Sequence, residues 1–321
     1  MDSLKIVFLD RDTIEKSIEI ARPSFAHQWR EYAQTPANRI LERLDDVDIA
    51  ITNKVAITAQ HLDALPELKF IAVAATGFNV IDIDACRKNN VVVSNAQDYA
   101  ASSVAEHTFA TILGLRRNLI EYREQLLAGA WQQAQQFCFF NSPIRNLRGG
   151  VLGIIGTGSI ATEVGRIGSA LGMTVVYHSL SGRTDLEAKT LVSLDEIFQS
   201  ADVLSLHCPL TEASNLLVNR QRFEQMKNTV LLINTARGEM VDLDDLEYAI
   251  DHGLIAGAAI DVAPIEPPPT ESPLLRLLQR PNFLLTPHIA WASVEAMQTL
   301  ADQVLENIEA FAIGKPIRVV T

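Results

Sequence analysis

The chain has 321 residues, of which 48% are hydrophobic and 21% are charged, a composition that suits a globular protein long enough for two domains. Acidic residues outnumber basic ones by 39 to 27, which argues against a broad basic surface for nucleic acid. No run of about eighteen apolar residues predicts a membrane span, and the amino terminus lacks the basic and apolar regions of an export signal. We therefore expect a cytoplasmic protein that binds neither nucleic acid nor a membrane.

The cysteines Cys86, Cys138 and Cys208 lie far apart and lack CxxC spacing. Neither a disulfide framework nor a zinc site has this pattern. We expect reduced thiols and no metal site.

Short apolar, β-branched runs alternate with helical patterns along the whole chain. This alternation is typical of parallel sheets covered by helices on both faces, so the sequence predicts an α/β fold. The predicted strands are Lys5–Leu9, Ile49–Thr52, Phe70–Ala74, Val91–Val93, Leu152–Ile155, Thr174–Tyr177, Val203–Leu206, Val230–Asn234, Gly257–Asp261 and Phe283–Thr286.

These strands form two sets, one before about residue 95 and one from residue 152 onward. A long helix, predicted from Ala101 to about Leu127, and an irregular stretch over residues 132–150 separate the two sets. The last predicted helix, about Ser293–Ala312, follows the final strand and can pack back on the first set. We therefore predict two doubly wound parallel-sheet domains, the second inserted into the first.

A glycine-rich turn, Gly156-Thr157-Gly158-Ser159-Ile160-Ala161, follows one of these strands and leads into a helix. In this GxGxxA pattern the first glycine permits a tight turn, the second lets a pyrophosphate approach the backbone, and the alanine allows close helix packing. The amides of the first helical turn then face the phosphates. A glycine turn alone is a weak signal, but strand, turn, helix and next strand in this order predict a Rossmann dinucleotide site.

The next strand ends where such sites usually place an acid that binds the ribose 2′-hydroxyl. Ser179 stands there instead, with Arg183 and His178 close by in sequence. Without the acid a 2′-phosphate is not repelled, and Arg183 or His178 can pair with it, which favours NADPH. The alternative is that Arg183 is a solvated charge and that NADH is used with a weaker grip on the ribose.

Three polar residues follow later strands: Arg237 in the segment NTARG, Glu266 in a proline-rich loop, and His288 in the segment TPH. Ligands of open α/β sheets bind outside the carboxyl ends of the strands, where all three are predicted to lie. Each residue alone has an ordinary structural interpretation. The three together behind a dinucleotide motif predict a catalytic site.

The order and spacing of these motifs resemble the D-isomer-specific 2-hydroxyacid dehydrogenase family, whose catalytic set is an Arg, a Glu about thirty residues later and a His about twenty residues beyond. Here the intervals are 29 and 22 residues. The motifs come in the family's order over most of the chain. Residues 74–79, Trp131 with Phe137-Cys138, and residues 287–291 are most similar to the glycerate dehydrogenase/hydroxypyruvate reductase branch.

The resemblance implies an enzyme that transfers a hydride between NAD(P)H and a small 2-keto acid, hydroxypyruvate or glyoxylate, to give a D-2-hydroxy acid. It implies a Rossmann cofactor domain, residues 100–287, inserted in a flavodoxin-like substrate domain, residues 1–99 and 288–321. Because imidazole titrates near neutral pH, His288 suits the role of proton donor. Glu266 would hydrogen-bond the other ring nitrogen, and Arg237 would polarise the carbonyl and hold the carboxylate.

The glycine motif, the segment around Ser179 and the resemblance imply further contacts with the cofactor and the substrate. The loop at Ala75 would offer backbone N–H groups to the substrate carboxylate. Trp291 would either pack on the substrate or cap the core, and His107 is expected to be structural. The cofactor set is Val104, Gly156, Gly158, Ser159, Ile160, Ser179, Arg183, His207, Pro209, Thr235, Ala236, Arg237, Asp261, His288 and Ala290; the substrate set is Asn53, Ala75, Thr76, Gly77, Arg237, His288 and Trp291.

Two alternatives remain for the function. A phosphoglycerate dehydrogenase-like enzyme would need more basic groups near the first-domain loop than Lys54 supplies. A nucleotide-sensing protein similar to the corepressors of this fold would keep the same residues and bind NADH without oxidising it. Separately, Phe137, Phe139 and Phe140 near the long helix indicate a homodimer formed by that segment.

Overall fold

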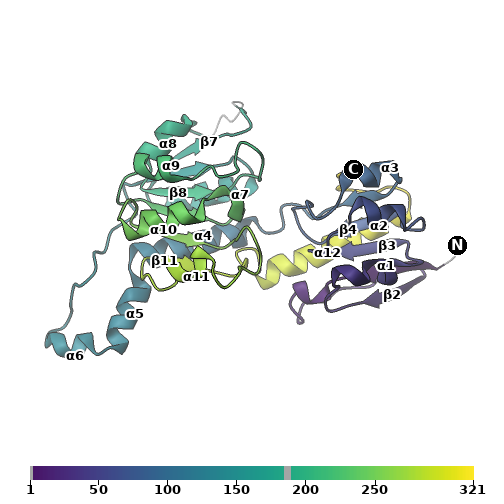
Figure 1. Cartoon of the computed structure of the whole chain (residues 1–321), viewed down its shortest axis with the longest axis horizontal. Coiled ribbons are helices and arrows are strands. Elements are labelled where there is room, and N and C mark those ends of the chain that lie inside the picture. The colour runs from purple at the N-terminus through teal and green to yellow at the C-terminus, as the bar shows by residue number, and fades with distance from the viewer. Residues whose placement is uncertain (1–2, 184–188) are drawn as a thin grey trace. The chain divides into compact units, whose positions relative to one another are not determined.

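The computed structural model describes residues 3–183 and 189–321 and consists of two compact units. Unit 1 comprises Met1–Ala100 and Ala292–Thr321, and unit 2 comprises Ala101–Trp291. Each unit is a parallel sheet flanked by helices, which confirms the predicted fold class (Figure 1). Within the described ranges, no helix has both the length and the apolar character needed to cross a bilayer.

The sheet of unit 1 has five parallel strands in the order β2-β1-β3-β4-β5, the flavodoxin-like arrangement. One of these strands, β2, was not predicted, because it is a polar edge strand with a half-exposed or exposed residue at every position. The elements are β1 (Leu4–Phe8), β2 (His27–Glu31), α1 (Ile40–Leu44), β3 (Ile49–Thr52), α2 (Ala59–Asp63), β4 (Phe70–Val73), α3 (Ile83–Lys88), β5 (Val92–Ser94) and α12 (Val294–Ala312).

The last helix, α12, returns to unit 1. Its amino terminus is capped by Ser293, whose hydroxyl accepts a hydrogen bond from the backbone of Ala296. The helix packs beside β4, where the rings of Phe311 and Phe70 stack with centroids 4.5 Å apart. Beyond it, Val320 donates a backbone hydrogen bond to Val93 in the middle of β5. The final segment of the chain therefore belongs to the first unit.

The sheet of unit 2 has six parallel strands in the order β11-β10-β9-β8-β6-β7. Leu191 forms a parallel bridge to Tyr177 of β7 and stands where a Rossmann sheet carries its third strand. The elements are α4 (Ala101–Arg116), α5 (Leu119–Leu127), α6 (Ala130–Ala134), β6 (Val151–Ile155), α7 (Ser159–Ala170), β7 (Thr174–His178), α8 (Leu194–Ser200), β8 (Val203–Leu206), α9 (Arg220–Gln225), β9 (Leu231–Asn234), α10 (Leu243–Asp251), β10 (Gly257–Ile260), α11 (Pro273–Leu277) and β11 (Phe283–Leu285).

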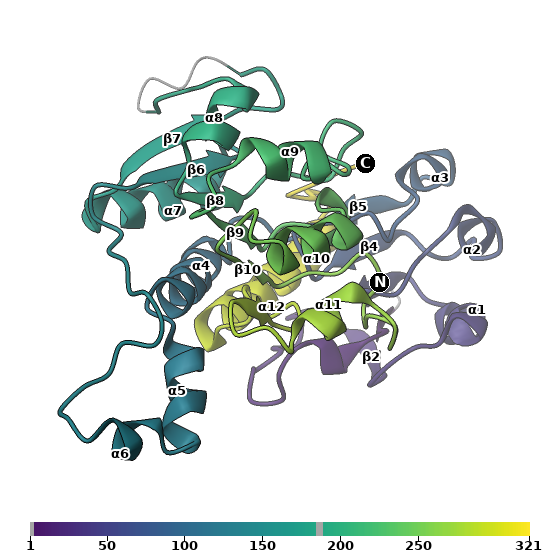
Figure 2. The same cartoon turned by 60° about the vertical axis from the view of Figure 1, so that its left-hand side comes forward.

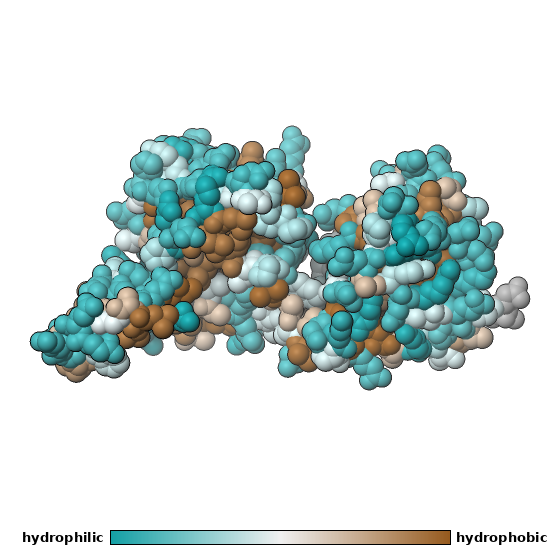
Figure 3. All heavy atoms as spheres, turned by 60° about the horizontal axis from the view of Figure 1, so that its bottom comes forward, coloured by the Kyte–Doolittle hydropathy of each residue, from teal (hydrophilic) through white to brown (hydrophobic). Residues whose placement is uncertain are grey.

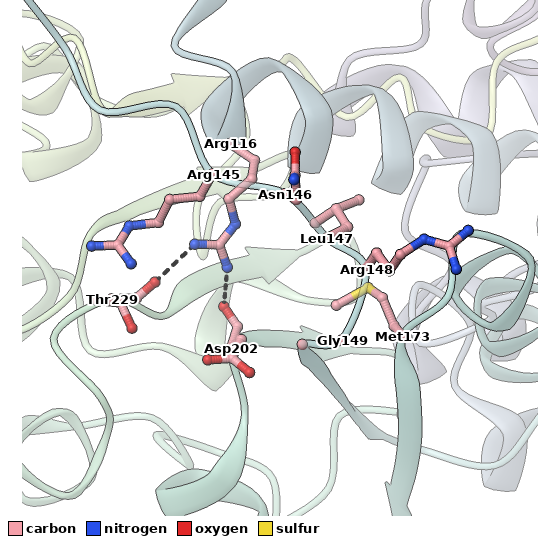
Figure 4. Close-up of a pocket in the computed structure, with 10 residues that line it drawn as sticks. Arg116, Arg145, Asn146, Leu147, Arg148, Gly149, Met173, Asp202 and Thr229 are labelled. Carbon is pink, nitrogen blue, oxygen red and sulfur yellow. Dashed lines mark hydrogen bonds between the residues drawn. The ribbon is translucent and has the colours of Figure 1, made fainter.

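The predicted single helix over residues 101–127 was wrong in one respect. It breaks after Arg116, and Asn118 takes a left-handed conformation before α5 begins. The buried guanidinium of Arg116 donates hydrogen bonds to the backbone oxygens of Asp202, at 2.6 Å, and Thr229, at 3.1 Å (Figure 4). These bonds hold the end of α4 against the segments that lead into β8 and β9.

Candidate active site

Gly156 forms the tight turn after β6, with a φ of 121° that L side chains rarely adopt. A Cβ atom there would also lie 2.2 Å from the backbone oxygen of His207, the residue that follows the neighbouring strand β8. Only glycine allows the two strand ends to approach so closely. The strand order reverses between β6 and β8, which is where Rossmann sheets open a crevice for a dinucleotide.

The first turn of α7 is open to a ligand. Gly158 caps this twelve-residue helix, and a Cβ atom on Gly158 would have no atom within 4 Å. Ser159 is exposed and Ile160 half-buried, so a phosphate can approach the backbone of the first turn. At the end of β9 the Thr235 hydroxyl is buried without a hydrogen-bond partner among the described residues. These features fit a dinucleotide along this edge of the sheet.

The loop after β7, called the ribose loop here, contains no acid in its described residues 179–183. The Ser179 hydroxyl accepts a 3.2 Å hydrogen bond from the backbone N–H of Arg183, whose residue is exposed. The Nδ1 atom of His178 instead lies 3.0 Å from the backbone oxygen of Val192, so this ring is committed to the protein. Ser179 and Arg183 therefore define the local chemistry.

Lys189 is a cation beside the glycine turn that sequence reasoning missed. Its Nζ donates hydrogen bonds to the backbone oxygen of Thr157, at 3.2 Å, and to the hydroxyl of Thr162, at 2.8 Å. The signal was weak, because the lysine lies ten residues beyond Ser179 in a segment with no motif of its own. The parallel bridge between Leu191 and Tyr177 places the segment that carries Lys189 next to β7.

His207, predicted to pass beside the adenosine ribose, has a ring held by the protein. Its Nε2 lies 2.7 Å from the Ser205 hydroxyl, and burial lowers the pKa of His207 to about 3. The imidazole is therefore neutral at physiological pH. Pro209, two residues later, is exposed.

The turn that carries Arg237 is organised by Asn234, the last residue of β9. The buried Asn234 amide donates to the Arg237 backbone oxygen at 2.8 Å and accepts from the Ala236 backbone at 3.0 Å. Gly238 follows, and a Cβ atom on it would lie 2.1 Å from the backbone of Ala263. The Arg237 turn and the loop that carries Glu266 thus touch backbone to backbone.

Glu266 and His288 form a hydrogen-bonded pair. The Nδ1 atom of His288 lies 2.7 Å from Oε2 of Glu266, while Oε1 accepts a 3.0 Å bond from the backbone of Ala263. An ionised carboxylate only accepts hydrogen bonds, so Nδ1 carries the proton and Nε2 is left for chemistry. The pair borders a mainly apolar cavity of about 400 Å³, whose walls include Leu275 and Leu285.

The backbone of His288 has a φ of 55°, in the left-handed region that residues other than glycine seldom occupy. It is held there by a 2.7 Å hydrogen bond from its N–H to the Asp261 backbone oxygen. The Asp261 carboxylate accepts from the next two amides, those of Ile289 at 3.0 Å and Ala290 at 2.9 Å. The Trp291 indole N–H donates to the His288 oxygen at 3.0 Å, so this tryptophan also holds the turn.

The predicted substrate loops belong to unit 1. Asn53 is buried, and its backbone N–H donates to the carboxylate of Asp10 at 3.0 Å. Thr76 is exposed, and its backbone oxygen accepts a 2.7 Å bond from the Asn95 amide, which fixes the loop of Ala75, Thr76 and Gly77. Val104 of the cofactor set lies buried in α4 of unit 2.

Unit 2 therefore combines, along one edge of a Rossmann sheet, an open helix terminus for phosphates and a carboxylate–histidine pair with one imidazole nitrogen available. A dinucleotide-dependent oxidoreductase that also transfers a proton requires these two elements.

Comparison with known proteins specifies the family. The sequence profile of the D-isomer specific 2-hydroxyacid dehydrogenase family, NAD binding domain, matches residues 109–290. Glycerate dehydrogenase of Methylorubrum extorquens is 40% identical over 317 residues, 98% of this chain and 98% of that protein. Hydroxypyruvate reductase of Blautia hydrogenotrophica is 33% identical over 288 residues, 89% of this chain and 88% of that protein.

A solved D-lactate dehydrogenase from Aquifex aeolicus, complexed with NAD and lactic acid, has a TM-score of 0.81 and 29% identity, covering 97% of this chain and 96% of that one. The chain belongs to the D-isomer specific 2-hydroxyacid dehydrogenase family. The resemblance and the enzyme class predicted from the sequence are thereby confirmed.

The close approach at Gly238 gives the first prediction. Gly238→Ala should lower kcat/KM about 100-fold, because its Cβ forces the Arg237 turn away from the Glu266 loop and misplaces reacting groups by about 1 Å. Steady-state kinetics measures the effect. The control is Gly114→Ala in α4, where the new Cβ meets only Leu284 at 3.7 Å and should leave activity unchanged. Equal activity of the two variants would contradict the proposed coupling of the loops.

Proposed function

We propose that the chain reduces hydroxypyruvate to D-glycerate, and the smaller glyoxylate to the achiral glycolate, with NAD(P)H. The observation that carries the proposal is the 2.7 Å hydrogen bond between His288 and Glu266, at the carboxyl ends of the strands of a Rossmann sheet. The names of the relatives reported above support the substrate class. In this proposal unit 2, Ala101–Trp291, is the cofactor domain and unit 1 is the substrate domain; the boundary expected from sequence after residue 287 lies four residues before the end of unit 2.

His288 supplies the proton of the reaction. A nicotinamide cofactor would supply the hydride to the keto carbon, and negative charge would then develop on the carbonyl oxygen. The proton on Nε2 of the imidazolium passes to that oxygen, leaving a neutral ring that Glu266 keeps in its Nδ1–H form. In the oxidative direction the same nitrogen removes the hydroxyl proton.

Arg237 is the proposed substrate-binding residue of unit 2. The guanidinium of Arg237 pairs with the carboxylate through its planar fork and stabilises the negative charge that develops on the carbonyl oxygen. In unit 1, the loop of Ala75, Thr76 and Gly77 has backbone N–H groups of the kind that bind a carboxylate. Recognition by one arginine and by backbone amides suits a small, unphosphorylated keto acid.

His288→Ala should lower kcat by at least 100-fold, because no other group donates the proton, while the dissociation constant for NADPH changes less than threefold. Stopped-flow turnover of hydroxypyruvate and fluorescence titration of the cofactor measure the two effects. The exposed His252, whose ring bonds to Tyr248, provides the control substitution His252→Ala. Turnover close to wild type in His288→Ala would show that the acid is another group.

The same assays separate the alternatives. A corepressor-like sensor would bind NADH and leave it unoxidised with hydroxypyruvate, glyoxylate and pyruvate alike. A phosphoglycerate dehydrogenase-like enzyme would oxidise phosphoglycerate faster than glycerate.

For the cofactor we propose a preference for NADPH, supported by the absence of an acid at Ser179 and by Arg183 one turn away. Ser179→Asp should shift the ratio of kcat/KM for NADPH over NADH at least tenfold towards NADH, because the carboxylate repels the 2′-phosphate and accepts the ribose hydroxyl. Ser169→Asp, at an exposed residue near the far end of α7, is the matched control. An unchanged ratio in Ser179→Asp would remove this loop from cofactor selection.

We also propose a homodimer formed by the arm of α5, α6 and the segment up to residue 142, which stands away from the sheet of unit 2 (Figure 2). Its large apolar side chains include Leu127, 73% exposed, Phe137, 88% exposed, and Phe140, 80% exposed. Figure 3 shows apolar surface at the base of this arm. Phe139 differs from the expectation: it is half-buried, with its ring centroid 5.5 Å from that of Tyr122.

In sedimentation the protein should run at about twice its chain mass of 35.3 kDa. Leu127→Glu should shift it towards the monomer, because a charge in an apolar interface is costly. Ile313→Glu, at an equally exposed residue of unit 1, should not. A monomeric wild-type protein would disprove the dimer.

A further inference from the structure

His107 lies on α4 and has no part in the catalytic set described above. Its side chain is 19% exposed, and its Nε2 lies 3.1 Å from the hydroxyl of Thr286 and 3.8 Å from Oδ1 of Asp261. Thr286 is the residue between β11 and the turn of His288. A helix on one side of unit 2 therefore reaches the segment that carries the proposed acid.

The Thr286 hydroxyl has a single hydrogen, and this fixes which group donates in each of its two hydrogen bonds. The Thr286 hydroxyl donates to Oδ1 of Asp261, which as a carboxylate oxygen can only accept. A hydroxyl has one hydrogen, so its oxygen faces His107 as an acceptor. His107 must therefore donate from Nε2, and its proton is fixed on that nitrogen in the neutral ring.

Asp261 links this contact to His288. Its Oδ1 accepts from the Thr286 hydroxyl and from the Ile289 backbone, and its Oδ2 accepts from the Ala290 backbone. The two amides follow His288 directly. Thr286 and Asp261 thus transmit the orientation set by His107 to the turn that holds the imidazole.

The turn needs such support because His288 occupies the left-handed region, at a φ of 55°. A residue other than glycine is strained there and keeps this conformation only where its surroundings hold it in place. If the orientation of Thr286 were lost, the Asp261 carboxylate could turn away from the amides. The imidazole would then sample positions in which Nε2 misses the substrate oxygen.

We propose that His107 is a positioning residue for the reduction: through Thr286 and Asp261 it holds the turn that aims the imidazole of His288. This inference rests on the proposed role of His288 as the proton donor. It assigns to His107 a function that the sequence interpretation, which made it structural, did not foresee.

The test compares variants that remove or keep each hydrogen bond. His107→Leu removes the donor, whereas His107→Gln places an amide N–H near the position of Nε2. Thr286→Val removes the hydroxyl at constant shape, whereas Thr286→Ser keeps it. We expect kcat to fall 10- to 100-fold in His107→Leu and Thr286→Val and less than threefold in His107→Gln and Thr286→Ser.

Three readouts separate positioning from stability. NADPH affinity should change less than twofold in all four variants, because the glycine turn at Gly156 and the ribose loop at Ser179 are untouched. The deuterium isotope effect on kcat with 4-deuterated NADPH should rise in the two impaired variants, because hydride transfer becomes more rate-limiting. The double variant His107→Leu/Thr286→Val should be no slower than the slower single variant, because both substitutions break one chain of contacts.

Wild-type kcat in His107→Leu, equal losses in His107→Leu and His107→Gln, or additive losses in the double variant would each overturn the inference. If His107→Leu does not fold, the comparison of Thr286→Val with Thr286→Ser decides. Full turnover in His288→Ala would instead refute the proposed function itself. Loss of turnover in His288→Ala, with wild-type rates in both His107→Leu and Thr286→Val, would refute only the positioning role.

Discussion

The active edge of unit 2 depends on one buried carboxylate, that of Asp261. It is 2% exposed and accepts hydrogen bonds from two backbone amides and a hydroxyl. A hydrogen bond to an ionised group contributes about 1.5–3 kcal/mol, so three of them can offset much of the cost of desolvating the charge. The bonds to the amides of Ile289 and Ala290 fix the segment that follows His288, whose backbone φ is 55°.

Unit 1 uses the same physical device. Asp10 follows β1, is 3% exposed, and accepts hydrogen bonds from the backbone of Asn53 and Lys54 at the end of β3. Burial raises the pKa of Asp10, while these amides act in the opposite direction. Parallel strands end with amides that the sheet does not satisfy, and in both units an acid from one strand end satisfies those of a neighbouring segment.

The parts predicted from sequence are those encoded locally. Alternating apolar runs gave every strand except the polar edge strand β2, and the motif around Gly156 gave the cofactor turn, because each signal lies within a few residues. The helix break at Asn118 could not be predicted in this way, because no proline or glycine stands at that position. Contacts of Lys189 with Thr162, or of His107 with Thr286, join residues 27 and 179 positions apart, and only the packed chain brings them together.

The three residues of the proposed catalytic set are coupled through one loop. Glu266 binds His288 with one carboxylate oxygen and the Ala263 backbone with the other. The same Ala263 leaves no room for a side chain at Gly238, next to Arg237. A displacement of residues 263–266 would therefore move both the partner of the imidazole and the support of the guanidinium. Because reacting groups must be held to within fractions of an ångström, this loop must be stiff, and its four prolines at positions 264, 267, 268 and 269 restrict the backbone accordingly.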